Sequence, residues 1–106
     1  MDEFVFRPER AQAFGTPDGK GFVVRAGSTA MRGGSPSVKR DRPLRDNLVA
    51  QGVLIPDADP DLYRFSRDHR FESASAAAGV VKDGNASGPN LWTHVGTGET
   101  LTEWRR

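Results

Sequence analysis

The chain contains no cysteine, only one tyrosine and two methionines, and no long hydrophobic run. Without cysteine it can form neither a disulfide framework nor a zinc–thiolate site. Its longest apolar stretches, Gly52–Ile55 and Ala76–Val81, are far too short to span a bilayer. The acidic start, Met1-Asp2-Glu3, lacks the basic and then apolar pattern of a secretory leader. We therefore expect a cytoplasmic protein that does not associate with membranes.

Length and composition indicate one small folded domain. A chain of 106 residues fits a single domain. A chain of this size can bury one modest core without disulfide bonds or metal ions to stabilise it. Hydrophobic residues make up 36% and charged residues 27%, which is typical of a folded protein and not of a disordered one. We expect residues 1–106 to form one domain.

The charge of the chain is unevenly distributed. Seven basic residues between Lys20 and Arg45 stand against Asp41 alone, a net +6 that leaves −5 for the rest of a chain whose net charge is +1. These basic residues are Lys20, Arg25, Arg32, Lys39, Arg40, Arg42 and Arg45. Such asymmetry favours an anionic partner, and DNA or RNA is the expected one. A solvated loop that gathers charge for solubility would have the same composition, so both interpretations stay open.

The first half of the chain reads as strands, a hairpin and a long loop. Phe4–Phe6 has the pattern of an edge strand. The apolar runs Ala11–Phe14 and Gly21–Ala26 flank Thr16-Pro17-Asp18-Gly19, whose turn-forming residues predict a hairpin. The Gly-, Ser- and Pro-rich residues Gly27–Arg42 predict a long basic loop.

Two helices are predicted. The first covers Pro43–Gly52, with proline suited to its start and glycine to its exit. Its spacing places Leu44, Leu48 and Val49 on one core-facing side. The second covers Ala74–Lys82, where Ser73 can cap the first free amides and small residues allow close packing. We expect Ala77 or Ala78 to face a sheet.

The remaining segments predict turns and short strands. They are an acidic turn at Pro56–Asp61, strands at Leu62–Phe65, Asp68–Phe71 and Leu91–Val95, a loop at Asp83–Asn90 and a final extended piece at Glu99–Trp104. The order of elements predicts an α+β fold, mainly an antiparallel sheet with two helices packed on it.

Several motifs in order along the chain carry a resemblance to a known family. They comprise Gly21-Phe22-Val23-Val24 with Gly27-Ser28; Leu44-Arg45, Leu48 and Gly52-Val53-Leu54; Phe65, Asp68, Phe71, Ser73 and Ser75 to Ala78; and Ser87-Gly88, Asn90, Trp92, Gly98, Thr100 and Leu101. Over about residues 11–101 the chain resembles a bacterial family of domains of unknown function, number 4357. The resemblance implies an accessory domain, commonly attached to nuclease-like domains of the GIY-YIG type, and therefore a nuclease or other protein partner.

The sequence offers no convergent catalytic group. Ser28 is predicted to be a turn serine that hydrogen-bonds to the backbone. A serine nucleophile needs a positioned general base, and the sequence does not indicate one. His69 and His94 stand far apart in the sequence and lack metal-ligand spacing. Asp57, Asp59 and Asp61 alternate but lack the closing glutamate of a calcium loop. We expect no enzyme activity, no cofactor and no metal.

Two function hypotheses follow. In the first, the domain is a non-catalytic accessory module that binds nucleic acid through the seven basic residues, with Asn90 or Trp92 near a base. Trp92 has an alternative role as a core residue packed against the alanine-rich helix. In the second, the domain is a protein-interaction or scaffold module that docks a partner through an exposed loop or edge strand, with Phe4 and Phe6 as anchors.

Overall fold

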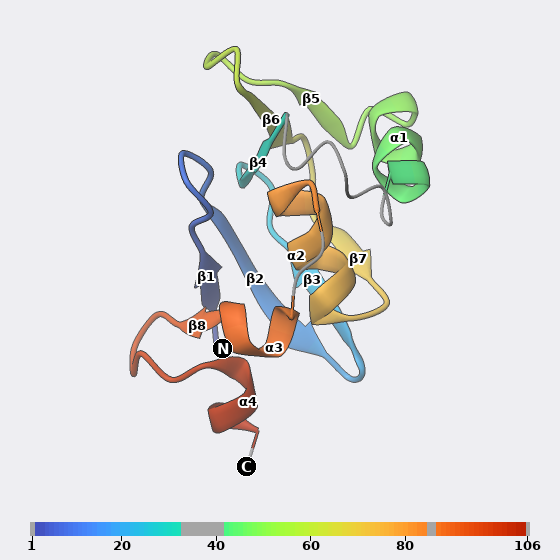
Figure 1. Ribbon diagram of the computed structural model, residues 1–106. Coiled ribbons are helices and arrows are strands. Elements are labelled where there is room, and N and C mark those ends of the chain that lie inside the picture. Colours follow the sequence, from blue (N-terminus) through green and yellow to red (C-terminus); the bar gives the residue numbers. More distant parts are fainter. Residues whose placement is uncertain (1, 33–41, 85–86, 106) are drawn as a thin grey trace.

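The computed structural model describes residues 2–32, 42–84 and 87–105, and it has the predicted α+β fold. Its strands lie in a five-stranded and a three-stranded antiparallel sheet (Figure 1). The strands are β1 (Phe4–Phe6), β2 (Ala13–Asp18), β3 (Gly21–Val24), β4 (Thr29–Met31), β5 (Leu54–Pro56), β6 (Leu62–Phe65), β7 (His69–Phe71) and β8 (Thr93–His94). The helices are α1 (Arg42–Ala50), α2 (Ala74–Lys82), α3 (Gly88–Leu91) and α4 (Leu101–Trp104).

The larger sheet has the order β7-β3-β2-β1-β8, and α2 and α3 lie on one of its faces (Figure 1). The predicted edge position of Phe4–Phe6 is therefore wrong, because β1 pairs with β2 on one side and β8 on the other. The short strand β8 comes from the far end of the chain, so this pairing could not be read from local sequence. Its consequence is that all three residues of β1 are buried.

The predicted hairpin is confirmed, with its turn shifted. β2 and β3 pair from Gly15↔Val24 to Asp18↔Gly21, which leaves Gly19 and Lys20 as the two turn residues. Gly19 has a φ of +61°, a conformation that glycine adopts readily. Pro17 lies within β2, two residues beyond Gly15, which pairs with Phe4, the first residue of β1. A proline is tolerated there because that side of β2 has no further strand to bond.

Both predicted helices are present. α2 has its predicted bounds, and the Ser73 Oγ accepts a hydrogen bond from the Ala76 amide at 3.0 Å. Ala77 and Ala78 are both fully buried, as expected for small residues at a close helix–sheet contact. α1 buries Leu48, but Val49 is 38% exposed, so its predicted place on the core side is wrong.

Three predicted segments differ from the structure. The long loop expected at Gly27–Arg42 contains β4. Residues 33–41 of that segment lie outside the described part of the chain. The expected loop after α2 contains α3, and the expected extended piece at the C-terminus contains α4. A signal for α4 was present: Thr100 and Glu103 form a capping box, in which each side chain bonds the other residue's backbone amide. Within the described ranges, no helix has the length and apolar character needed to cross a membrane.

Candidate functional site

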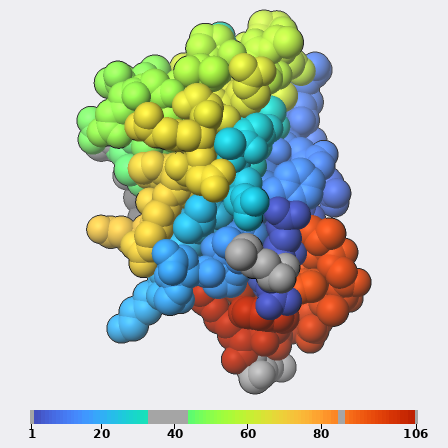
Figure 2. Space-filling model, turned by 180° about the vertical axis from the view of Figure 1, so that it is seen from behind, coloured from blue at the N-terminus to red at the C-terminus, as the bar shows by residue number. Residues whose placement is uncertain are grey.

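One face of the larger sheet carries none of the helices in the described part of the chain. The face toward α2 and α3 buries Phe4, Phe6, Phe22 and Val24, and their neighbours along each strand point the other way. On that other face, which we call the open face, Val5 is buried, with 7% of its surface exposed, whereas four other residues are half-buried: Phe14, Thr16, Val23 and Thr93. Figure 2 shows this side, with strand residues in blue and cyan across its middle.

A row of side chains crosses the open face from strand to strand. Val5 pairs with Phe14 on one side and with Thr93 on the other. Beyond Phe14 the row reaches Arg25, whose amide donates a 2.8 Å hydrogen bond to the Phe14 carbonyl. The row therefore brings together residues from three separate parts of the chain, and it was not predicted from the sequence.

A shallow hollow of about 360 Å³ lies at the Arg25 end of the row. It is lined by Glu3, Phe14, Arg25 and the turn Ala26–Ser28. Ser28 is buried, and its Oγ accepts from the Phe14 amide at 2.9 Å, so the expectation of a backbone-bonded turn serine is confirmed. This bond fixes the turn against β2 and so holds one wall of the hollow.

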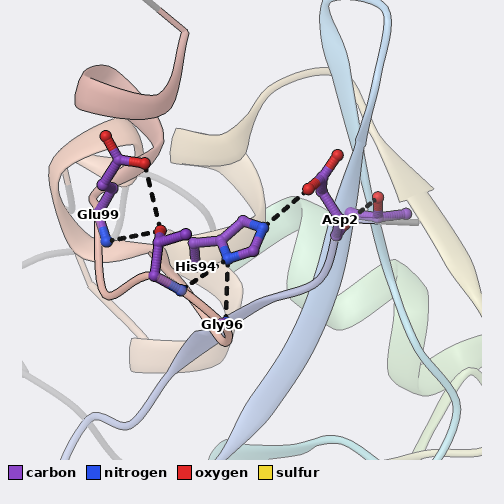
Figure 3. A network of polar contacts seen from close by, with 6 residues as sticks. Asp2, His94, Gly96 and Glu99 are labelled. Atoms are coloured by element: carbon purple, nitrogen blue, oxygen red, sulfur yellow. Dashed lines mark hydrogen bonds and ion pairs between the residues drawn. The ribbon is translucent and has the colours of Figure 1, made fainter.

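A second hollow, of about 370 Å³, lies at the other end of the row, beside Val5, Arg7 and Thr93. His94 lines it and is held by polar contacts on both ring nitrogens (Figure 3). Its Nε2 lies 2.8 Å from a carboxylate oxygen of Asp2, while its Nδ1 accepts from the amides of Gly96 and Thr97 at 3.0 and 3.1 Å. Because Nδ1 accepts twice, the proton of the neutral ring lies on Nε2 and points to Asp2.

Among the residues that the structure describes, the predicted basic side chains do not gather in one patch. Lys20 is exposed at the tip of the β2–β3 hairpin, and Arg25 is exposed at the other end of β3. Arg25 Nε lies 3.9 Å from the Asp68 carboxylate, and both side chains are about half exposed. A pair so long and so open to water contributes little to stability, so Arg25 can exchange it for another anion. Lys39 and Arg40 lie outside the described residues, and Arg42 is the first residue of α1.

Arg45 is a correction to the predicted site. It is only 2% exposed, its Nε lies 3.6 Å from Asp83, and its Nη1 donates to the Val80 carbonyl. Its guanidinium and that of Arg32 both lie over the Tyr63 ring, 5.3 and 4.8 Å from the centroid. Arg45 therefore joins α1 to the C-terminal end of α2, where a cation also suits the helix dipole, and its side chain is buried away from solvent.

Trp92 is the second correction. It is fully buried, its Nε1 donates to the Ala74 carbonyl at 3.0 Å, and its ring packs against Phe6 and Phe22. Its core role is the one observed, so it has no surface on which a base could stack. Asn90 is exposed, but its amide bonds Ser87 and Thr102 and so joins α3 to α4.

Comparison with protein families gives a match over residues 4–105 to the family described as a domain of unknown function (DUF4357). The chain belongs to this family. Comparison with curated proteins gave no match, and neither did comparison with solved structures.

The motif residues that carry the DUF4357 resemblance mostly build the fold. Besides the Ser73 cap and the buried Arg45 and Trp92, the Ser75 Oγ accepts from the Gly88 amide at 3.1 Å. A Cβ on Gly88 would lie 2.2 Å from the Ala74 carbonyl carbon, so only glycine fits where α3 approaches α2. These motif residues therefore hold the architecture in place.

The open-face residues were not predicted as a site because the sequence pattern that indicates them is weak. Ala13 and Gly15 alternate with Phe14 along β2, and this pattern of small residues around one aromatic is the trace that the sequence carries. Within the described ranges, no cluster of three or more histidine, aspartate or glutamate side chains could hold a metal ion.

Proposed function

We propose that this domain is a non-catalytic accessory module that binds nucleic acid, acting beside a catalytic partner such as a nuclease. The observation that carries the proposal is the concentration of positive charge between residues 20 and 45, which persists at a net +5 once the buried Arg45 is removed from the +6. Phosphate contact needs only accessible cations and amides, and it does not need a preformed pocket.

The positions of the accessible cations support a long anionic ligand. Lys20 and Arg25 lie at opposite ends of β3, so a compact anion such as one phosphate group would not reach both. A polymer with a charge at every nucleotide can contact separated cations along its length.

A salt titration tests the proposal. Binding to single-stranded DNA, single-stranded RNA and duplex DNA is measured by fluorescence anisotropy at increasing salt concentration. We expect the logarithm of the affinity to fall linearly with the logarithm of the salt concentration, because bound phosphates release counterions. Absence of binding to every one of these ligands at low salt would overturn the proposal.

Matched arginine variants locate the contacts. Arg40→Ala with Arg42→Ala, and separately Lys20→Ala with Arg25→Ala, should weaken binding and reduce the salt slope by about one unit for each lost contact. Arg10→Ala with Arg64→Ala is the control, because these two exposed arginines on other elements lie outside the basic segment. Equal loss in the control would mean that binding depends on overall charge and not on this segment.

The alternative, a protein-docking module anchored by Phe4 and Phe6, has less support. Phe4 is fully buried and Phe6 is 8% exposed, because β1 lies inside the sheet and the two rings pack against other aromatic side chains, Phe4 against His94 and Trp104 and Phe6 against Trp92. Neither ring can anchor a partner, so the feature that would have favoured this function is missing from the surface.

A further inference from the structure

The geometry points to a nucleobase site on the open face: we propose that the hollow beside Phe14 takes one base of a single-stranded nucleic acid. This proposal rests on the proposed function. It adds that the nucleic acid is single-stranded and that Phe14 is the residue on which a base stacks. It starts from Phe14, the aromatic side chain at the centre of the row that crosses the open face.

Phe14 offers a stacking surface that is fixed in place. Its backbone is held by three contacts: it pairs with Val5, its amide donates to the Ser28 hydroxyl, and its carbonyl accepts from the Arg25 amide. Its side chain is half-buried and lines a hollow of about 360 Å³, enough space for a planar ring. Bases stack on such side chains with little dependence on sequence, because every base has a π face.

The charges around the hollow separate the base from the phosphate. Glu3 lines the hollow, so a phosphate inside it would meet a carboxylate, whereas a neutral base would not. Arg25 lines the same hollow and is exposed, so it can contact the phosphate of the seated nucleotide from the rim. The Glu3 carboxylate can also accept a hydrogen bond from the exocyclic amine of cytosine.

The row continues in a direction that suits a single strand. Val5 and Thr93 lead from Phe14 to the second hollow, where Arg7 supplies another exposed cation. In a duplex the bases are stacked inside and cannot lie on a sheet face without being unpaired. The described helices α2 and α3 lie on the opposite face, so neither can enter a groove from this side (Figure 1).

The test compares strands with and without bases. An oligodeoxycytidylate, the matching oligoribocytidylate, an abasic deoxyribose-phosphate strand of the same length and a duplex are titrated with the intact domain. One stacked base predicts that the base-bearing single strands bind about 5- to 150-fold tighter than the abasic strand. Comparing the affinities for the deoxyribose and ribose strands shows whether DNA or RNA is the preferred ligand.

Variants at Phe14 then assign the effect. Phe14→Leu keeps an apolar side chain for folding but removes the ring, so the preference over the abasic strand should disappear. Phe14→Tyr keeps the ring and should keep the preference, and Thr16→Ala, on the same face of β2, should leave it unchanged. Melting curves establish that each variant is folded.

The outcomes separate the inference from the proposed function. Equal salt-dependent binding of base-bearing and abasic strands, or a preference that survives in Phe14→Leu, overturns the base site and leaves phosphate binding intact. No binding to any strand overturns both. A preference that is lost in Phe14→Leu and kept in Phe14→Tyr supports the assignment.

Discussion

The indole Nε1 of Trp92 donates a 3.0 Å hydrogen bond to the carbonyl oxygen of Ala74, across 18 residues of sequence. This bond joins the first turn of α2 to the residue that ends α3. It makes the tryptophan part of the core and leaves any binding activity of the domain to other residues.

Trp92→Phe should therefore destabilise the domain without reducing its affinity for nucleic acid. The change removes one buried hydrogen bond and part of a fully buried ring, which we expect to lower the free energy of unfolding by about 1–3 kcal/mol. Urea denaturation measures the loss, and Trp104→Phe, at a half-buried position, is the control with a smaller expected effect. A loss of affinity in folded Trp92→Phe would contradict its core role.

Gly88→Ala should destabilise the contact between α2 and α3. The added Cβ would lie within 2.2–2.3 Å of three backbone atoms of Ala74 and Ser75, which cannot move aside as a flexible side chain could. We expect a cost of about 1–3 kcal/mol or more by thermal or urea denaturation. Gly84→Ala is the matched control, because a Cβ there meets nothing within 4 Å, and it should stay within about 0.5 kcal/mol. Equal effects of the two changes would contradict the close approach.

Arg45→Met and Asp83→Asn should each be strongly destabilising. The two side chains are 3% and 4% exposed and lie 3.6 Å apart, so removing one charge takes a nearby opposite charge away from the other in a buried place, at a cost of about 3–5 kcal/mol. The double variant should lose less than the two single variants together, because neither charge is then left behind. Urea denaturation of the four proteins measures this difference. Strictly additive losses would show that the two groups do not interact.

His69 predicts a pH dependence of stability. Partial burial, together with the charge of Arg67, lowers the pKa of His69 from its ordinary value of 6.5. The unfolded chain therefore takes up a proton at higher pH than the folded domain does. Stability is unaffected above the ordinary pKa, falls as the pH drops toward the lowered pKa, and levels off below it. His69→Gln should remove this slope in unfolding free energies measured across that interval, and a slope that persists would assign it to another group.

Local patterns in the sequence were enough to predict the elements whose hydrogen bonds join residues that are close in the chain. The bounds of α2 followed from a serine cap and a run of small residues, and the β2–β3 hairpin followed from a turn sequence between two apolar runs. In both cases the partners lie a few residues apart, so neighbouring side chains carry the information.

The place of β1 and the identity of the core side of α1 could not be obtained in this way. Spacing alone cannot distinguish Val49 from Arg45 at the edge of a helix face, and Asp83, whose charge accompanies the burial of Arg45, stands 38 residues later. Likewise, β1 is interior only because β8, almost ninety residues away, pairs with it.

By itself the sequence determined the family, the α+β class and the unequal distribution of charge. The tertiary structure alone decided which of the singled-out residues remain accessible: it buried Arg45 and Trp92 and placed Phe14, Glu3 and Arg25 around one hollow on the open face. The physical reason is that composition and short-range pattern record what a residue can do, whereas exposure depends on contacts between segments that are distant in the chain.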